Sequence, residues 1–268
     1  GTWVQIDYLA RVYGQTKMER YADAARRGIR YILKSQRSSG GWRGADVDAI
    51  TFNDGVTSGV MGTLKTILDD KDLYSFVPDD ERAMVQRAYD RGLACILKCQ
   101  IKVGDRLTAW CQQHSHRTFQ PVWARSYEPP SIVTAESVGV VRFLMSIDNP
   151  SPEVIRSIRS AVAWFDRVKI EGLRIKRVDA KAVHSGKRWY DYDNVEVKDP
   201  DAPPIWARFY NLKTEKPIFC TRAGKITDKY TDGSRERRTG YSWYGYYPEK
   251  LLKEDYPAGR KKHGIETE

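Results

Sequence analysis

Apolar residues recur at helical spacing in the first part of the chain. Val4, Tyr8 and Val12, for example, are four residues apart and fall on one stripe of a helix. The same spacing, bounded by glycine or polar turns, predicts three helices before residue 70, over residues 3–14, 23–36 and 53–69. We therefore expect this part of the chain to be helical.

Two helical segments repeat. The sequence RGIRYILKSQ at 27–36 recurs 64 residues later as RGLACILKCQ at 91–100, and GVMGTLKTI at 59–67 is echoed by GVVRFLMSI at 139–147. A third pair of helices is predicted from Pro152 onward. Helix pairs that repeat in this way bury their apolar faces against neighbouring pairs. We therefore expect an all-α fold, an (α/α)3 toroid of helix hairpins with long loops.

Glycines interrupt the second type of repeated helix. Gly59, Gly62 and Gly139 each cost about 1 kcal/mol relative to alanine inside a helix. Such a cost is tolerable where helices pack closely, so we expect close helix contacts at these positions.

The pattern changes after about residue 167. β-branched and aromatic residues in 206–212 and 216–222 alternate with turn signals, which predicts short β segments near the C-terminus. Residues 172–204 are expected to form a long surface loop, and the segment RRTGYSWYGYYPEKLL is expected to return to a short helix.

Length and composition favour one globular domain. The 268 residues, 41% of them hydrophobic, can bury one substantial core, so we expect a single monomeric domain over 1–268. No apolar run reaches the roughly 18 residues of a membrane-spanning helix. The chain opens inside an amphipathic pattern without a signal peptide, which indicates a trimmed N-terminus.

The chain is strongly basic. Forty-five Lys and Arg residues against 35 acids give a net charge of +10. A charge of this size favours a polyanionic partner, such as nucleic acid, an anionic membrane or an acidic polysaccharide. The basic residues are dispersed and no nucleic-acid-binding motif is present, so nucleic acid is disfavoured. We expect neither nucleic acid nor a membrane as the partner.

The most informative stretch is residues 107–136, where aromatic, basic and amide side chains gather with little helical or strand periodicity. Three prolines within it fix φ and remove N–H donors, so we expect an irregular segment between two helices. Flat apolar rings beside hydrogen-bond donors suit a sugar ring or a carboxylate. The side chains of this kind are Trp110, Gln112, Gln113, His114, Trp123, Arg125 and Tyr127.

From the residues alone, several candidates also have ordinary structural explanations. Arg125 can form a surface ion pair with Glu128 or Asp105 as readily as it can bind a ligand. His114 can be a hydrogen-bonded structural histidine. Asp54, at the start of a predicted helix, is more often a cap than a ligand.

Motifs from separate segments resemble those of one family. WCQQH, QPxxAR and YEPPS, followed by ESVGVVRFLM, are similar to motifs of the family 10 polysaccharide lyases, which are calcium-dependent pectate lyases. TFND near the N-terminus, and WxRFY and FxxRxG near the C-terminus, resemble the same family. The similarity covers nearly the whole chain.

The resemblance implies a secreted pectate lyase that cleaves polygalacturonate, the acidic chain of pectin, by β-elimination to unsaturated products. It implies that Arg125 is the base that removes the C5 proton, that Arg208 and Arg222 bind substrate carboxylates, and that Asp54 is a calcium ligand. The other side chains expected to bind the substrate are Arg43, Trp110, Gln113 and His114.

Two departures from the family pattern are visible. The family has an Asp-Asn-Gly-Ala-Thr motif at its N-terminal helix, and its acid would fall before Gly1 of this chain. The family also has a longer loop after Trp42, whereas here Arg43 takes the place of a basic cleft residue. Asp46 or Asp48 can substitute as acids.

Two other functions also fit the sequence. A catalytically impaired protein of the same fold would still bind acidic polysaccharides through its basic aromatic cleft. A glycoside hydrolase needs two carboxylates across a sugar bond, for which Glu128 and Glu136 are the candidates. An arginine base is chemically demanding because a guanidinium pKa stays above about 12, so the lyase interpretation predicts alkaline activity.

Overall fold

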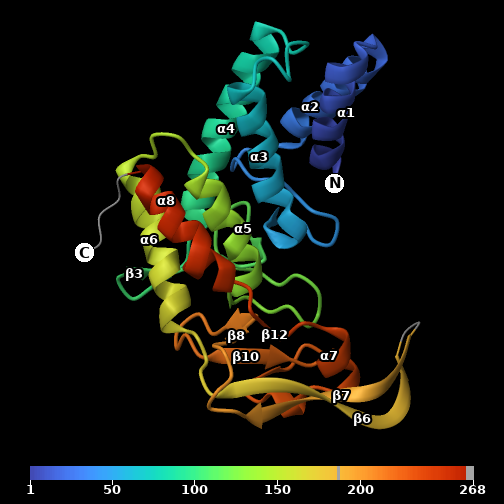
Figure 1. Ribbon diagram of the computed structural model, residues 1–268, viewed down its shortest axis with the longest axis vertical. Helices are drawn as coiled ribbons and strands as arrows, with labels where there is room; N and C mark the ends of the chain where they lie inside the picture. The colour runs from blue at the N-terminus through green and yellow to red at the C-terminus, as the bar shows by residue number, and fades with distance from the viewer. Residues whose placement is uncertain (186–187, 264–268) are drawn as a thin grey trace. The chain divides into compact units, whose positions relative to one another are not determined.

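The computed structural model describes residues 1–185 and 188–263. The chain forms two compact units (Figure 1). Unit 1 comprises Gly1–Cys99 and Gln113–Gln120, and unit 2 comprises Gln100–Gln112 and Pro121–Glu268. No helix in the described part of the chain is both long and apolar enough to cross a membrane.

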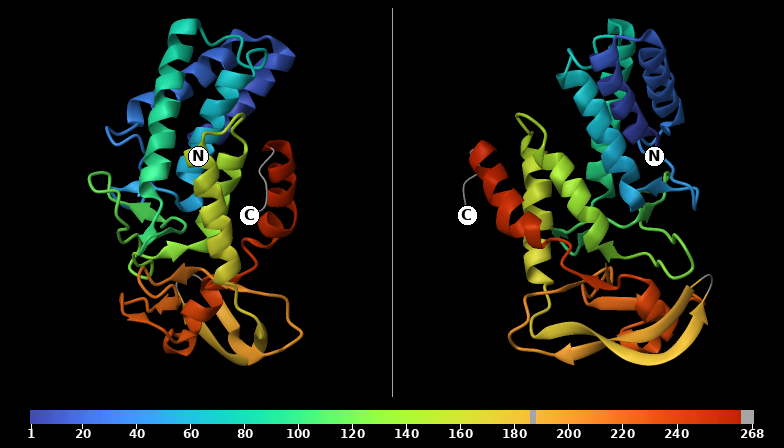
Figure 2. Two further views of the ribbon diagram at one scale, coloured as in Figure 1. Left: turned by 90° about the vertical axis from the view of Figure 1, so that its left-hand side faces the viewer. Right: turned by 45° about the vertical axis from the view of Figure 1, so that its right-hand side comes forward.

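Unit 1 is mainly helical, and the helices predicted from the periodicity are confirmed. Its helices are α1 (Thr2–Thr16), α2 (Glu19–Ser35), α3 (Val56–Asp69) and α4 (Asp79–Cys99). Helix α1 packs against α2 and α3, and α3 packs against α4 (Figure 2). A short antiparallel ladder between β1 (Ile50–Thr51) and β4 (Gln113–His114) joins the 113–120 segment to this unit.

The glycine shared by the two copies of the RG repeat has the same role in each. A Cβ atom on Gly28 of α2 would lie 2.6 Å from Ile6 Cγ1 of α1. A Cβ atom on Gly92 of α4 would lie 2.3 Å from Met61 Sδ of α3. Both distances are shorter than real Cβ contacts, so the repeat marks a place where each helix pair packs closely.

The glutamine that ends each copy of the repeat is also used in the same way. Gln36 Nε2 donates to the Ala88 carbonyl of α4 at 2.8 Å, within unit 1. Gln100 Nε2 donates to the Ser157 carbonyl of α6 (Pro152–Arg167) at 3.0 Å, within unit 2. Each amide also bonds a carbonyl of the loop that follows it. The sequence repeat is therefore a structural repeat of helix ends.

The helical part of unit 2 packs around α5. Its members are α5 (Thr134–Met145), α6, the π-helical turn η3 (Leu251–Asp255) and α8 (Tyr256–His263). Helix α5 contacts both α6 and η3. Helix α6 begins at Pro152, and the Ser151 hydroxyl caps it by accepting from the Val154 N–H at 3.3 Å.

Unit 2 also contains two antiparallel sheets and two hairpins, so the prediction of an all-α fold is wrong. The strands are β2 (Lys102–Val103), β3 (Arg106–Leu107), β5 (Ile132–Val133), β8 (Trp206–Ala207), β9 (Phe209–Tyr210), β10 (Pro217–Cys220), β11 (Ile226–Thr227) and β12 (Tyr244–Gly245). One sheet has the strand order β11-β10-β9-β5, and β12 pairs with β8. The short β segments predicted at 206–212 and 216–222 are confirmed.

The largest departure from the sequence prediction is at residues 172–204. Instead of a long surface loop, this region contains a hairpin of β6 (Leu173–Ser185) and β7 (Arg188–Lys198), 13 and 11 residues long. The short helix α7 (Arg235–Gly240) packs against β7 (Figures 1 and 2). The hairpin and the four-stranded sheet make unit 2 a mixed structure of helices and strands, which a fold built from helix hairpins does not describe.

Candidate active site

Arg125 lies in a tight turn of the loop that precedes α5. The Glu128 N–H donates to the Arg125 carbonyl at 2.8 Å, and the Arg125 N–H donates to Glu128 Oε2 at 3.1 Å. The guanidinium binds the same carboxylate, with Nε 2.8 Å from Oε2 and Nη2 on Oε1. The Glu128 side chain is fully buried, whereas that of Arg125 is 44% exposed. This bidentate pair therefore fixes the guanidinium at the protein surface.

Arg208 lies between β8 and β9, and its backbone bonds to two other segments. Its N–H donates to the Trp243 carbonyl at 2.6 Å, and its carbonyl accepts from the Thr134 N–H at 3.0 Å, where α5 begins. Glu136 in the first turn of α5 therefore comes next to Arg208, and the two side chains form a buried ion pair.

Arg222 follows β10 in a turn that Gly224 completes with a φ of +84°. Ser126 Oγ donates to the Arg222 carbonyl at 2.9 Å, which ties this turn to the loop before α5. The Arg222 guanidinium binds Glu236 of α7, with Nη2 2.6 Å from Oε1. Three separate segments of unit 2 thus meet at this arginine.

Three arginines lie over one tyrosine ring. The guanidinium carbons of Arg125, Arg222 and Arg237 are 5.1, 5.6 and 4.5 Å from the centre of the Tyr127 ring. Arg237 comes from α7, and its Nε donates to Glu236 Oε2 at 2.8 Å. Guanidinium groups interact favourably with an aromatic face at such distances, so Tyr127 holds cations from three segments together.

Tyr241 links Arg208 and Glu128 to the Tyr127 ring. Its ring meets Tyr127 edge to face at 5.2 Å, and the Arg208 guanidinium lies 5.1 Å from its centre. Its hydroxyl donates to Glu128 Oε1 at 2.9 Å. We call these residues the arginine cluster; its members are Arg125, Arg208, Arg222, Arg237, Tyr127 and Tyr241. The three arginines expected to carry the chemistry are therefore brought together within unit 2.

Carboxylates balance most of the charge of the arginine cluster. Glu128, Glu136 and Glu236 bind its four guanidinium groups, which leaves one excess positive charge when every group is ionised. Arg222 and Arg125 expose 58% and 44% of their side chains. An anionic ligand can therefore reach these two arginines from solvent.

Several buried polar atoms beside the cluster have no hydrogen-bond partner. Among the described residues they include Gln112 Oε1, Glu136 Oε2, Arg208 Nε and Arg237 Nη1. A buried donor or acceptor without a partner costs about 1–3 kcal/mol. Such atoms are rare in folded proteins, and their concentration here marks a place that water or a ligand completes.

The carboxylates keep the arginines in their charged form. Hydrogen bonds to Glu128 raise the pKa of Arg125 further above its ordinary value. Burial acts to lower the pKa of Arg208, but the negative charge of Glu136 outweighs it and the net shift is upward. The hydrogen bond with Arg237 lowers the pKa of Glu236 to about 2. Arg125 is therefore a cation at neutral pH, and its neutral form grows as the pH rises.

Three side chains expected to contact a substrate are buried. Trp110 has no exposed surface and lies in the core. His114 is also fully buried, with Nδ1 2.7 Å from the Phe119 carbonyl, and burial lowers its pKa to about 4. Gln113 accepts a hydrogen bond from Thr51 Oγ1 at 2.7 Å. These contacts stabilise the loop from inside and argue against direct contact with a polysaccharide.

The remaining two candidates, Arg43 and Asp54, are exposed residues of unit 1. Arg43 lines a cavity of about 850 Å³ together with Trp42. Asp54 has a left-handed backbone, with φ at 52°, in the turn η1 (Asn53–Gly55) before α3. The N-cap of α3 is Gly55, so the capping role weighed for Asp54 is not found. The Asp54 carboxylate has no hydrogen bond or ion pair with another described residue.

The described residues do not form a complete calcium site on their own. They contain no group of three or more His, Cys, Asp or Glu side chains that could hold a metal ion. Calcium takes roughly six to eight oxygen ligands, and Asp54 supplies one unpaired carboxylate on a strained backbone. Asp54 alone therefore supplies too few ligands, and a calcium ion at this position would need further oxygen ligands from water or from a bound carboxylate.

Some members of the site could not be recognised from sequence. Glu236, Arg237 and Tyr241 all belong to the segment RERRTGYSW, whose clustered basic and aromatic residues are the only signal. Their contacts with the loop before α5 arise from the packing of α7, which no local motif reports.

The known proteins that this chain resembles are polysaccharide lyases. The family model for pectic acid lyase matches residues 1–252. A family 10 polysaccharide lyase from Cellvibrio cellulosa is 31% identical, with a TM-score of 0.83 over 98% of this chain and 79% of that chain. A mutant of a family 10 lyase from this organism, in complex with trigalacturonic acid, is 30% identical, with the same TM-score over 98% of this chain and 80% of that chain.

No curated protein sequence matches the chain significantly. The family model nevertheless spans both units, and the structural relatives carry the family name that the motifs suggest. The resemblance is thereby confirmed, and the chain belongs to the pectic acid lyase family of polysaccharide lyases.

Proposed function

We propose that this polysaccharide lyase is a pectate lyase that cleaves polygalacturonate by β-elimination. The observation that carries the proposal is the convergence of Arg125, Arg208 and Arg222 on one pair of tyrosine rings. Polygalacturonate has a carboxylate on every sugar, so neighbouring guanidinium groups match its charge. The relative in complex with trigalacturonic acid supports this class of substrate.

The reaction needs a base and a way to stabilise negative charge. Arg125, as a neutral guanidine, takes the C5 proton, and the electron pair of the C5–H bond forms the C4–C5 double bond. The bond between C4 and the glycosidic oxygen breaks, and that oxygen leaves with its electron pair and gains a proton from water. Negative charge grows on the adjacent carboxylate as the proton leaves, and Arg208 and Arg222 offset it.

The ion pair with Glu128 sets the expected pH dependence. Because Glu128 raises the pKa of Arg125, only a small fraction of Arg125 is neutral guanidine at neutral pH. As long as the pH stays below that pKa, this fraction rises about tenfold for each unit by which the pH increases. We expect kcat/KM to rise steadily with pH through the alkaline range. A rate that falls above neutral pH contradicts an arginine base.

We propose calcium as the cofactor, held by Asp54 jointly with a carboxylate of the polymer. When bound, the ion supplies positive charge against the uronate group. The proposal is supported by the exposed, unpaired Asp54 carboxylate on a left-handed backbone.

A glycoside hydrolase has less support. Such an enzyme needs two carboxylates that reach the sugar bond. Glu128 is fully buried against Arg125 and Tyr241. Glu136 is paired with Arg208 and only 5% exposed. Neither carboxylate is free to act on a sugar as acid or base.

The proposal is tested by following cleavage of polygalacturonate through the ultraviolet absorbance of the unsaturated product, with calcium and then with a chelator. A pectate lyase gives absorbance that calcium supports and the chelator abolishes. Reducing ends without absorbance indicate a hydrolase. Binding of the polymer without either product indicates a catalytically impaired protein and contradicts the proposal.

A substitution in the arginine cluster links the activity to the site. Arg222→Ala removes a half-exposed guanidinium that faces solvent, so we expect KM to rise about tenfold or more. Arg27→Ala removes an exposed arginine from α2 and serves as the matched control for the loss of one positive charge. Equal KM values for the two variants would argue that Arg222 does not bind the substrate.

A further inference from the structure

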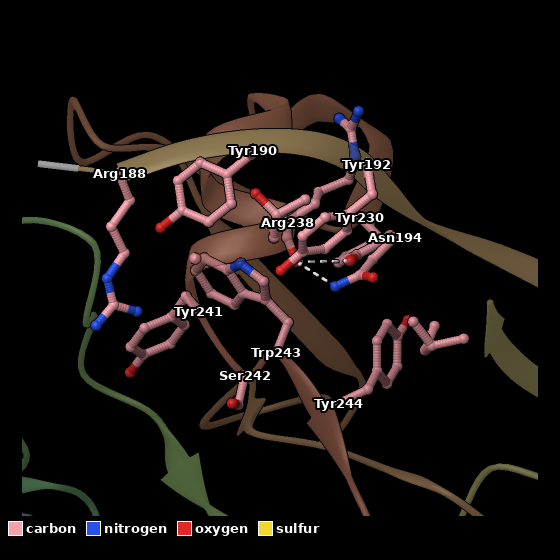
Figure 3. A pocket seen from close by; sticks show the side chains of 13 residues that line it. Arg188, Tyr190, Tyr192, Asn194, Tyr230, Arg238, Tyr241, Ser242, Trp243 and Tyr244 are labelled. Atoms are coloured by element: carbon pink, nitrogen blue, oxygen red, sulfur yellow. Dashed lines mark hydrogen bonds between the residues drawn. The ribbon is translucent and has the colours of Figure 1, made fainter. Parts of the chain in front are cut away.

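A second cavity lies along the hairpin of unit 2. Successive side chains of a strand point to opposite faces, and the alternate residues Arg188, Tyr190, Tyr192 and Asn194 of β7 line one side of a pocket of about 290 Å³. The segment 238–244, which runs from the end of α7 to the start of β12, lines the other side (Figure 3). We call this the hairpin pocket.

Hydrogen bonds fix the back of the hairpin pocket. Asn194 Nδ2 and the Tyr230 hydroxyl donate to the Arg238 carbonyl at 3.0 and 3.3 Å (Figure 3). The Arg238 guanidinium is in turn bound by Asp193, with Nε 3.0 Å from Oδ1. The polar groups on this side are therefore occupied by one another, and they supply a rigid wall.

The front of the hairpin pocket carries a cation without a partner. Within the described residues, the Arg188 side chain has no ion pair and no hydrogen bond, whereas Arg238 is paired with Asp193. In Figure 3, Arg188, Tyr190 and Tyr241 lie along one edge of the pocket, with their polar ends on the same side. The uncompensated charge of the pocket is therefore positive, beside two phenol groups.

Tyr241 connects the hairpin pocket to the arginine cluster. One side of this residue lines the pocket, while its ring contacts Tyr127 and its hydroxyl donates to Glu128. A chain molecule bound at the arginine cluster therefore has a second cationic pocket next to it in the same unit.

We propose that the hairpin pocket is an additional subsite that binds one negatively charged sugar residue of the polymer. Arg188 binds the carboxylate, and Tyr190 and Tyr241 contact the ring and its hydroxyl groups. The volume is at the low end for ligand pockets, which suits a single sugar residue. This inference rests on the proposed function, because it extends the same polymer from the arginine cluster into the pocket.

The test compares oligogalacturonates of increasing length on the wild-type protein and the Arg188→Ala variant. For oligomers long enough to reach the pocket, we expect kcat/KM of the variant to fall about tenfold, the usual effect of one charge-assisted hydrogen bond. For oligomers too short to occupy the arginine cluster and the pocket together, we expect kcat/KM within about twofold of wild type. An equal effect at every length, or none, overturns the subsite.

Two further variants sharpen this test. Lys176→Ala removes a positive charge from the same hairpin, but Lys176 pairs with Val195 on the opposite face and does not line the pocket, so we expect wild-type kinetics. Gly240→Ala places a Cβ 2.9 Å from the Tyr190 hydroxyl and pushes that side chain aside. We expect this variant to lower kcat/KM selectively for long oligomers, as we expect of Arg188→Ala.

Calorimetric titration of hexagalacturonate separates this inference from the proposed function. If the wild-type protein yields no unsaturated product, the proposed function fails, but binding can still be measured. About tenfold weaker binding by Arg188→Ala than by wild type supports the subsite. Equal affinity of the two proteins, or no binding by the wild type, overturns it.

Discussion

Glu128 controls the position and the charge of Arg125. Its carboxylate is fully buried, accepts three hydrogen bonds from the backbone and side chain of Arg125, and accepts a fourth from the Tyr241 hydroxyl. Burial acts to raise the pKa of Glu128, but the hydrogen bonds from Arg125 and Tyr241 outweigh it and the net shift is downward. A proposed base thus has its own counter-ion, which orients the guanidinium while making it harder to deprotonate.

This pairing leads to a prediction about Glu128→Gln. The amide keeps the shape of the side chain but loses its negative charge, so the pKa of Arg125 falls. If Arg125 is the base, the alkaline limb of the pH–rate profile moves to lower pH. We also expect the maximal kcat of the variant, measured at the pH where its rate is highest, to fall, because an amide cannot hold the guanidinium through two acceptor oxygens.

A carboxylate elsewhere in unit 2 provides the control. Glu215 binds the guanidinium groups of Arg106 and Arg167 outside the arginine cluster, so Glu215→Gln breaks comparable ion pairs. We expect this variant to keep the wild-type pH profile. If Glu128→Gln also leaves the profile in place, Arg125 acts by binding the substrate and another group removes the proton.

Glu236 should make the stability of the protein pH-dependent. Its pKa is about 2, below the ordinary value of 4.5, chiefly because Arg237 and Arg222 bind it. A lowered carboxyl pKa contributes stability that is present above the unfolded-state value and is lost as the pH falls toward 2. Because the Arg222 partner is exposed and solvent screens part of this interaction, we expect the shift to contribute on the order of 1–2 kcal/mol.

We therefore expect Glu236→Gln to be destabilised by about 1–2 kcal/mol at pH 7 and to approach wild type near pH 2. Urea unfolding at several pH values measures both curves. A difference between the two proteins that stays constant from pH 7 to pH 2 would show that Glu236 acts through packing and not through its charge.

At the residue scale, the sequence predicts the residues that lie in short motifs and the contacts between residues close together in the chain. Arg125, Arg208 and Arg222 can be picked out because each lies in a short motif, and Glu128 is visible as a partner three residues from Arg125. The hydrogen bond between Tyr241 and Glu128 joins residues 113 apart, so no motif predicts it. The burial of His114 also depends on residues distant in the sequence, so its position in the motif does not predict it.

At the element scale, close helix packing explains one of the helix glycines but not another. A Cβ on Gly59 of α3 would lie 2.4 Å from Trp3 Cε2 of α1, which confirms the expected close contact there. A Cβ on Gly62 would meet no atom within 4 Å, so the same expectation is wrong at Gly62. The positions of Gly59 and Gly62 in the sequence therefore do not show which of the two lies against another helix.

The two glycines form a matched pair of substitutions. We expect Gly59→Ala to lose about 1–3 kcal/mol of unfolding free energy, because the methyl group overlaps the Trp3 ring. Gly62→Ala should gain up to about 1 kcal/mol from helix propensity. Urea unfolding of both variants measures the difference, and equal stability would mean that Trp3 moves away at little cost.

The β6–β7 hairpin shows why a strand can be missed. Its residues mix charges with tyrosines, and most of β7 is exposed or half-buried, so no continuous apolar face marks it as a strand. What selects the strand is its pairing with β6 and the packing of α7 against one face. Such tertiary contacts outweigh the secondary-structure propensity of the individual residues. The helices of unit 1 were predictable because their apolar stripes are long and regular.

At the scale of the whole molecule, net charge should affect how the polymer is bound more than how it is cleaved. The chain carries +10, yet many of its arginines are paired with carboxylates, so the excess is spread over the surface. Attraction between exposed charges is screened over about 10 Å at 0.1 M salt and about 3 Å at 1 M. Ion pairs that are buried, such as Arg208 with Glu136, are screened much less.

We therefore expect the KM for polygalacturonate to rise several-fold between low salt and 1 M sodium chloride at constant calcium, while kcat changes little. Trigalacturonate has only three carboxylates, so its KM should depend less on salt than that of the polymer. Initial rates over a series of salt concentrations measure both substrates. If kcat falls while KM stays constant, salt acts on the buried ion pairs of the arginine cluster, and long-range attraction is not what brings the polymer to the site.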